Sequence, residues 1–109
     1  MGASNRVHAL VLDSVNAAAL GAYQPLITLT ESIFLLRIVN DSNTAVFISY
    51  DGVNDHDYIA PNGSLQIDFQ TNAAPNNWVA LMPKNRIVYV RGVAGVGLIA
   101  ASGYYVQPL

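Results

Sequence analysis

The densest group of polar side chains in this 109-residue chain lies between Asp51 and Asp57. This stretch holds three of the seven acidic residues, Asp51, Asp55 and Asp57, together with His56. Carboxylate oxygens gathered on one loop are the ligands that Ca²⁺ takes in proteins. The spacing differs from an EF-hand loop, because Gly52 follows the first acid directly and no glutamate closes the site. The simpler interpretation is a tight turn whose acids face water. We therefore expect no bound metal, and these three aspartates are the ligands that a cation would use.

Two histidines, His8 and His56, could serve as general bases. No serine lies in a nucleophile-elbow pattern, and no two carboxylates are spaced as a pair for glycoside hydrolysis. His8 lies between Val7 and Ala9, which is typical of a histidine at the edge of a core or an interface. We predict that the chain is not an enzyme and uses no cofactor. An active site would require a pocket in which His8 or His56 meets a carboxylate at hydrogen-bond distance.

Aromatic side chains offer a different kind of site. The single tryptophan, Trp78, follows a loop-like stretch rich in Asn and Pro at residues 72–77. Flat amphipathic rings stack on sugars and are also common in protein interfaces. The chain could therefore be a carbohydrate-binding module that uses Trp78. The alternative, which we prefer, places Trp78 in the core or in an interface. The other available rings are Tyr50, Tyr58, Tyr89, Tyr104 and Tyr105.

The low content of charged residues indicates whether the protein surface is exposed to water or covered by other protein. Charged residues make up 11% of the chain and hydrophobic residues 52%, whereas an average soluble domain has about 25% charged residues. Because so few charged side chains cannot cover the surface of a free monomer well, we expect part of that surface to be covered by other protein. This composition is typical of a component of an assembly.

The amino-acid composition and its distribution along the chain also exclude other function classes. The five cations, Arg6, Arg37, Lys84, Arg86 and Arg91, are scattered, and the net charge is −2. Nothing here neutralises a row of phosphates, so we expect no nucleic-acid partner. The chain has no cysteine, which excludes disulfides and thiolate zinc sites. Asp13, Ser14 and Asn16 interrupt the apolar N-terminal stretches, so we expect neither a signal peptide nor a membrane span.

These side chains must be positioned by β-strands, because short segments rich in Val, Ile, Leu, Phe and Tyr alternate with clusters of Asn, Asp, Gly and Pro. The expected strands are Arg6–Asp13, Tyr23–Thr30, Ser32–Val39, Ala45–Tyr50, Asp57–Ile59, Ser64–Gln70, Arg86–Val93 and Gly97–Val106. At most one short helix is expected near residues 14–22, with Ser14 as N-cap and Gly21 as stop. The pattern predicts an all-β fold: a two-sheet antiparallel β-sandwich, jelly-roll-like, with about eight strands. A small closed barrel is the alternative.

We expect a single domain over residues 1–109, with residues 1–5 as an N-terminal arm and 104–109 as an apolar C-terminal tail. The segment Ile33–Val39 is apolar on both faces, so it should lie centrally in a sheet or be covered by another subunit. Arg37 within it then needs a partner or a path to solvent. The side chains that we expect at an interface are Ile33, Leu35, Arg37, Trp78, Tyr104, Tyr105, Val106 and Leu109.

The order of these features resembles small β-sandwich structural proteins of tailed bacteriophages, in particular capsid cement or decoration proteins and head–tail adaptors. The resemblance spans about residues 33–106. The segments that carry it are Val46–Gly52 with Asp55–Asp57, Pro61–Ser64 before a strand, Lys84–Arg91, and the glycine-rich hairpin that closes on Tyr104 and Tyr105.

The resemblance implies a non-enzymatic virion protein, made in the host cytoplasm, that forms homo-oligomers, with a trimer favoured. Its partners would be copies of itself and other virion proteins such as the major capsid protein. The expected role is that of a capsid cement or decoration protein that stabilises the shell. A head–tail adaptor, tail or baseplate component is the alternative within this class, and the carbohydrate-binding module is the alternative of another class.

Overall fold

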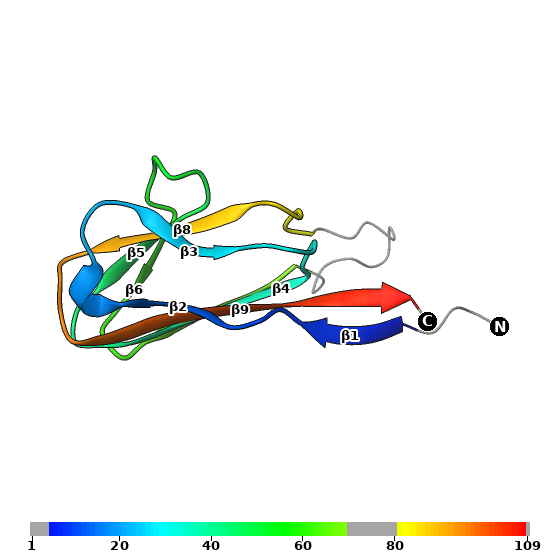
Figure 1. Cartoon of the computed structure of the whole chain (residues 1–109), viewed down its shortest axis with the longest axis horizontal. Helices are drawn as coiled ribbons and strands as arrows, with labels where there is room; N and C mark the ends of the chain where they lie inside the picture. The colour runs from blue at the N-terminus through cyan, green and yellow to red at the C-terminus, as the bar shows by residue number, and fades with distance from the viewer. Residues whose placement is uncertain (1–4, 70–80, 109) are drawn as a thin grey trace.

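The computed structural model of the chain describes residues 5–69 and 81–108. Within these ranges the chain forms nine strands and one short 3₁₀ helix, arranged as two antiparallel sheets (Figure 1). The predicted all-β two-sheet sandwich is confirmed. The closed barrel is wrong, because no described strand of one sheet pairs with a strand of the other.

The chain crosses several times between the two sheets. Sheet A has the order β1-β9-β4-β7, with β2 also paired to β9. Its strands are β1 (Asn5–Ala9), β2 (Asp13–Asn16), β4 (Leu35–Ser42), β7 (Ser64–Asp68) and β9 (Gly97–Pro108). Sheet B has the order β3-β8-β5-β6. Its strands are β3 (Gln24–Thr28), β5 (Val46–Ser49), β6 (Asp57–Ile59) and β8 (Ile87–Gly92).

The strand order is that of a jelly roll. β1 and β2 pair one after the other with β9 and together act as one interrupted strand. Counted in this way, the order is first, eighth, third and sixth in sheet A, and second, seventh, fourth and fifth in sheet B. Two Greek keys wrapped into two sheets give this arrangement. The prediction of about eight strands with a jelly-roll-like topology is therefore confirmed.

A one-residue bulge interrupts the first strand, which the sequence predicted as continuous from Arg6 to Asp13. Ala9 lies opposite Tyr104 and Asp13 lies opposite Ala101, so residues 10–12 face only residues 102–103 of β9. Such an extra residue bends a strand and leaves part of it unpaired. Of the bulged residues the first is buried, while Val11 and Leu12 are 89% and 63% exposed.

The helix near residues 14–22 is shorter than expected. Ser14 lies in β2, so its predicted role as N-cap is wrong. The cap is Asn16, whose side chain accepts a hydrogen bond from the Ala18 N–H at 2.9 Å, and the 3₁₀ helix η1 covers only Ala17–Ala19. Pairing of β2 with β9 holds the backbone extended up to Asn16, which leaves room for a single turn.

The central strand β4 confirms one expectation and corrects another. It lies between β9 and β7, as the two-faced apolar segment Ile33–Val39 indicated. The predicted strand ended at Val39, but the polar stretch Asn40–Ser42 that follows belongs to β4 as well. Asn40 and Ser42 point inward and are buried, which is possible because the fold supplies partners for their polar groups.

Asn40 links the two sheets through its side-chain amide. Nδ2 donates to the carbonyl oxygens of Thr44, Ala60 and Ile59, at 2.8, 3.1 and 3.3 Å. The Ser42 hydroxyl donates to Asn40 Oδ1 at 2.5 Å. Asn40 is in sheet A and Ile59 is in β6 of sheet B, so this buried amide joins one end of the sandwich.

The core fills the space between the sheets with aliphatic side chains. The fully buried ones include Leu29, Ile33, Leu36, Ile38, Val46, Ile48, Val88, Val90 and Ile99. The side chains of the predicted strand Ser64–Gln70 alternate in sequence between polar and apolar, and the structure agrees, because Leu65, Ile67 and Phe69 pack against this core while Gln66 is exposed. A turn at Pro61–Gly63 precedes β7, as a proline followed by Asn and Gly favours. Asn62 takes a positive φ of 61°, and the Gly63 N–H donates to the Ala60 carbonyl at 2.9 Å.

Candidate interaction surface

The acidic loop between β5 and β6 is a self-contained turn. Asp51 Oδ1 accepts hydrogen bonds from the N–H groups of Val53 and Asn54, at 2.8 and 2.9 Å, and from the Ser49 hydroxyl at 2.9 Å. These bonds, the Asn54 backbone bond first, hold the pKa of Asp51 well below its usual range. Gly52 has a φ of 77°, which favours glycine. The tight turn predicted at Asp51-Gly52 is therefore confirmed.

Asp55 ties this loop to sheet B. Arg91 of β8 donates to Asp55 from Nε at 2.8 Å and also from Nη2, so both carboxylate oxygens are engaged. The Tyr23 hydroxyl donates to the same carboxylate. The bonds from Arg91, and then that from Tyr23, lower the pKa of Asp55 to about 2. The Arg91 guanidinium also lies 4.3 Å from the centre of the Phe47 ring, a distance at which a cation–π contact stabilises the arrangement.

Asp57 has a third set of contacts. It accepts a hydrogen bond from the Tyr50 hydroxyl at 2.5 Å. Burial of Tyr50, followed by this bond, raises the pKa of the phenol. The three aspartates are thus directed to different partners, and among the described residues no group of three or more His, Asp or Glu side chains is placed to hold a metal ion. The fold uses Asp51, Asp55 and Asp57 to hold the loop on the sandwich.

The histidines are also engaged in local packing. His56 stacks on Tyr50, and its Nδ1 accepts the Tyr50 N–H at 3.0 Å. Its Nε2 lies 3.8 Å from Asp51 Oδ2, which is beyond hydrogen-bond distance. His8 stacks on Tyr105, with ring centroids 5.3 Å apart. Neither contact gives a histidine a hydrogen-bonded carboxylate, which an active site of the kind considered above requires.

A groove of about 210 Å³ opens at the bulge. It is lined by Leu10, Val11, Leu12, Asp13, Ile27, Thr28 and Thr30. The lining is mostly aliphatic and includes neither histidine. The groove therefore brings together none of the residues that the sequence suggested for chemistry.

The outer face of sheet A, the side turned away from sheet B, is the more informative surface. Strand pairing fixes which side chains share it, because directly opposite residues point to the same side. Leu35 of β4 lies opposite Tyr104 of β9, and Val39 lies opposite Ala100. Further along β9, Val106 lies opposite Val7 of β1. These pairs place apolar side chains on the outer side of all three strands. Arg37 and Ser102 separate the pair at Val39 from the pair at Leu35, and Asp68 of β7 lies opposite Leu35.

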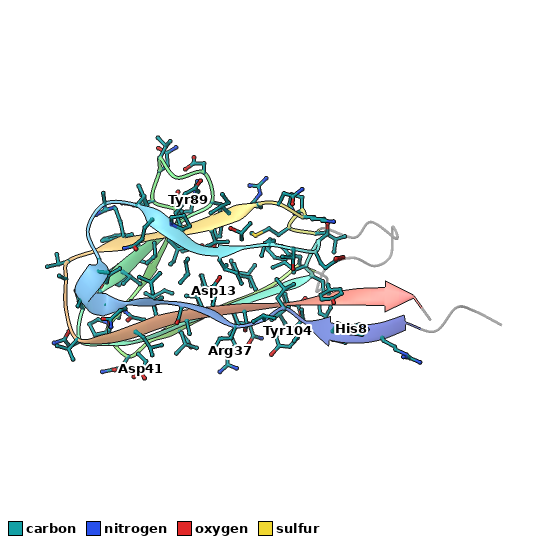
Figure 2. All side chains as sticks on the ribbon, viewed as in Figure 1. His8, Asp13, Arg37, Asp41, Tyr89 and Tyr104 are labelled. Carbon is teal, nitrogen blue, oxygen red and sulfur yellow. The ribbon has the colours of Figure 1, made fainter. Side chains whose placement is uncertain are left out.

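Few charges interrupt this face on the two central strands. Arg37 and Asp41 of β4 point away from sheet B (Figure 2), and both are exposed. Arg37 therefore has the path to solvent that its apolar surroundings in the sequence required. Its neighbours across the strands are Ser102 and Gln66, which are small or neutral. The face combines apolar and small polar side chains, a composition that suits contact with protein.

The predicted interface residues divide into three groups. Leu35, Arg37, Tyr104 and Val106 lie on the outer face of sheet A, as described above. Ile33 does not, because its side chain is fully buried in the core; its backbone exchanges two hydrogen bonds with that of Met82. Tyr105 points to the inner side, against the core and His8. Trp78 and Leu109 lie outside the described residues.

The expected apolar tail from Tyr104 onward is a strand. Up to Pro108 it continues β9 and pairs with β1 along its whole length. Sequence reasoning missed Val7, Val39 and Ala100 as members of the outer face. No sequence signal marks Ala100, because residues 98–101 are all apolar; the alternation appears only in the structure, where Ile99 and Ala101 are buried and Ala100 is more open.

Comparisons with known proteins add no family. The chain matches no protein-family model and no curated protein at a significant level. Among the residues that the structure describes there is no helix with the length and hydrophobicity needed to cross a lipid bilayer.

Proposed function

We propose that this chain is a non-enzymatic structural protein of a bacteriophage virion, a homo-oligomeric cement or decoration subunit that stabilises the shell. The observation that supports this most strongly is the outer face of sheet A, where apolar side chains lie in cross-strand register with few charges. The chain has only 11% charged residues. An exposed face with apolar side chains and few charges is typical of a surface that another protein covers.

The jelly roll adds support of a weaker kind. This topology is common in viral capsid domains, but it also occurs in lectins and cupins, and a fold alone does not determine function. Two features favour the structural role over a catalytic one. The carboxylates of the acidic loop accept hydrogen bonds that hold the loop on the sandwich. His56 has no carboxylate at hydrogen-bond distance.

In this proposal the outer face of sheet A contacts the shell, and Arg37 with Asp41 provides the polar contacts at its centre. Affinity would come from buried apolar area and not from net charge, so binding should persist in moderate salt. A head–tail adaptor or baseplate subunit would use the same face against a different virion partner.

The test places a charge on this face. Val39→Glu introduces a carboxylate between Ser64 and Ala100 on the half-buried outer side of β4. Thr28→Glu is the matched control, because Thr28 is exposed and belongs to sheet B. Wild-type and Thr28→Glu proteins should co-sediment equally with purified particles of the virus that encodes the chain. The Val39→Glu protein should lose at least about tenfold in occupancy while its melting temperature stays close to that of the control.

Two results would contradict the proposal. One is Val39→Glu protein that binds particles as well as the wild type. The other is a wild-type chain that is absent from purified particles. Labelling of the bound subunit on particles separates a shell position from the neck or the baseplate.

A further inference from the structure

The free edge of β1 has backbone groups that no described strand uses. β1 is a terminal strand of sheet A and pairs only with β9. Together the two strands form a ribbon that extends past the sheet B strands (Figure 1). A two-stranded ribbon is at best marginally stable in water, whereas a ribbon within a wider sheet is stable.

The direction of each backbone group follows from one hydrogen bond. The Leu10 N–H donates to the Gly103 carbonyl at 2.8 Å, so this opposed pair is hydrogen-bonded. Opposed pairs alternate in an antiparallel ladder. His8–Tyr105 and Arg6–Gln107 are therefore also hydrogen-bonded pairs. The N–H and C=O groups of Asn5, Val7 and Ala9 accordingly point away from β9.

An independent contact supports this assignment. The alternation requires that the Tyr104 backbone, opposite Ala9, points to the other side of β9, toward β4. The Phe34 N–H does donate to the Tyr104 carbonyl at 3.0 Å. The free edge of β1 thus offers donors and acceptors at every second residue, in the arrangement of a complete strand edge.

Other edge strands of the sandwich have features that discourage pairing, and β1 has few. β3 contains Pro25 and a register irregularity beside it. β6 has only three residues. Asp13 and Asp68 place charges on β2 and β7. Proline, irregular pairing, short length and charge are the usual protections of an edge. β1 has no proline and is regular over five residues. It carries one charged residue, Arg6, as β2 and β7 each do, so charge does not distinguish these three edges.

We propose that β1 pairs with β1 of a second copy of this chain, antiparallel and about a two-fold axis at Val7. This inference rests on the proposed assembly function and names the partner that the chain's own edge fits. The free N–H and C=O groups of this edge lie only at odd-numbered residues. Each odd-numbered residue must therefore face an odd-numbered residue of the partner, so the two residue numbers add up to an even value. A sum of 14 places Val7 opposite the partner's Val7 and Asn5 opposite the partner's Ala9. It uses all three residues of each edge.

The same register also matches the side chains. The two Val7 residues lie on the same face of the joined sheet, and Val106 lies opposite Val7 within each copy. Four valines therefore form a row across the junction, where Val7 alone is 65% exposed in the single chain. Arg6 lies opposite the partner's His8 and not opposite a second arginine, so no two arginines oppose each other directly.

A two-fold pair of this kind is isologous and closes at two copies. It therefore predicts a dimer in solution in place of the trimer that the resemblance implied. The contact is small, so we expect a reversible dimer that forms at micromolar to higher concentrations. Both outer faces of sheet A lie on the same side of the joined sheet and stay available to a common surface.

The test uses the orientation of the Val7 N–H. Val7→Pro removes a donor that points to the free edge and leaves the β1–β9 hydrogen bonds in place, a substitution that edge strands tolerate. Val7→Thr is the matched control, because it is β-branched and keeps the N–H. Sedimentation equilibrium at about 100 µM should give a dimer for wild-type and Val7→Thr protein and a monomer for Val7→Pro, each with native circular dichroism.

Cross-linking provides a second measurement, since the chain has no cysteine. Val7→Cys places one thiol at the two-fold axis, where the Cβ atoms of a hydrogen-bonded pair are about 5.5 Å apart. This is beyond the ~4.5 Å that a disulfide spans, so a short bismaleimide should give the thiol-linked dimer. Val11→Cys, which is more exposed but lies in the bulge, should cross-link at least about tenfold more slowly, as expected for collisional encounter alone. A wild-type monomer or trimer, or equal cross-linking at both positions, would overturn the pairing.

The outcome is separable from the proposed function. A dimer that fails to bind particles refutes the virion role and leaves the pairing of β1 intact. A chain that binds particles but is monomeric or trimeric in solution refutes the pairing and leaves the virion role intact.

Discussion

Replacing Asn40 by alanine should be one of the most destabilising changes that this fold can undergo. Asn40 is fully buried, and its amide is the polar link between β4 and the backbone around β6. An amide nitrogen has two hydrogens, so the contacts to Thr44, Ala60 and Ile59 amount to two full hydrogen bonds, one of them shared. The bond from Ser42 to Oδ1 is the third.

Three buried hydrogen bonds at a net value of about 1 kcal/mol each give a loss of about 3 kcal/mol in the free energy of unfolding. Two effects act in opposite directions on this figure. The Ala60 carbonyl keeps the Gly63 N–H as a partner at 2.9 Å, which limits the loss. The Thr44 carbonyl keeps the Ser42 hydroxyl at 3.0 Å, but the Ile59 carbonyl loses its amide donor inside the core. We therefore expect Asn40→Ala to lower the free energy of unfolding by about 3 kcal/mol, a large part of the total stability of a small domain.

Urea denaturation followed by far-ultraviolet circular dichroism measures this loss. Asn54→Ala is the control, because it removes an amide that is exposed and bonds only to Asp51 in the acidic loop. Its cost should stay below about 1 kcal/mol. Asn40→Asp should cost more than Asn40→Ala, since a buried carboxylate would face three carbonyl oxygens. Our reasoning would be refuted by an Asn40→Ala protein as stable as the Asn54→Ala protein.

Two further predictions concern the backbone and the acidic loop. Gly97 has a φ of 122°, and a Cβ there would lie 2.1 Å from the Asp41 carbonyl oxygen, so Gly97→Ala should lower the free energy of unfolding by about 3 kcal/mol or more. Gly21→Ala, where a Cβ meets no atom within 4 Å, should be nearly neutral in the same urea titration. Asp55 has a pKa lowered to about 2, so its bonds to Arg91 and Tyr23 stabilise the fold above the unfolded value of about 3.9 and are lost as the pH falls toward 2. In thermal melts between pH 5 and pH 2, Asp55→Asn should therefore show a smaller decline than the wild type, and an equal decline would contradict this role.

Several parts of the fold could be predicted from the sequence because they depend on near neighbours. The alternation of Leu65, Ile67 and Phe69 with polar residues predicts a strand with one exposed face, and the structure has it. Proline followed by Asn62 and Gly63 predicts the turn that the backbone adopts. The two-sided apolar pattern around Leu36 predicts a strand inside a sheet. In each case the period of the side chains or the φ preference of one residue is sufficient.

The candidate interaction surface, the outer face of sheet A, could be predicted only in part. The sequence indicated that Leu35, Arg37, Tyr104 and Val106 belong to an interface, and all four lie on the outer face of sheet A. It also included Ile33, which is buried. Alternation shows that two sets of side chains lie on opposite sides of a strand, but it does not say which side faces the second sheet.

Three features were decided by contacts between distant segments. Asn40 and Ser42 have the composition of a turn, yet they continue β4 because the backbone near Ile59 accepts the amide. The one-residue bulge after Ala9 reverses the side to which the following residues point. The strand order places β1 at the end of sheet A, paired with β9 alone, at an edge that no other described strand covers.

The sequence by itself thus determined the strands, their turns and the shortage of charge, because these follow from side-chain period and local φ preference. The tertiary structure decided which strands are neighbours, which face is outward and which edge stays open. Those properties depend on the register between β1, β4 and β9, and register is set by pairings between residues up to 103 positions apart, such as Asn5 and Pro108.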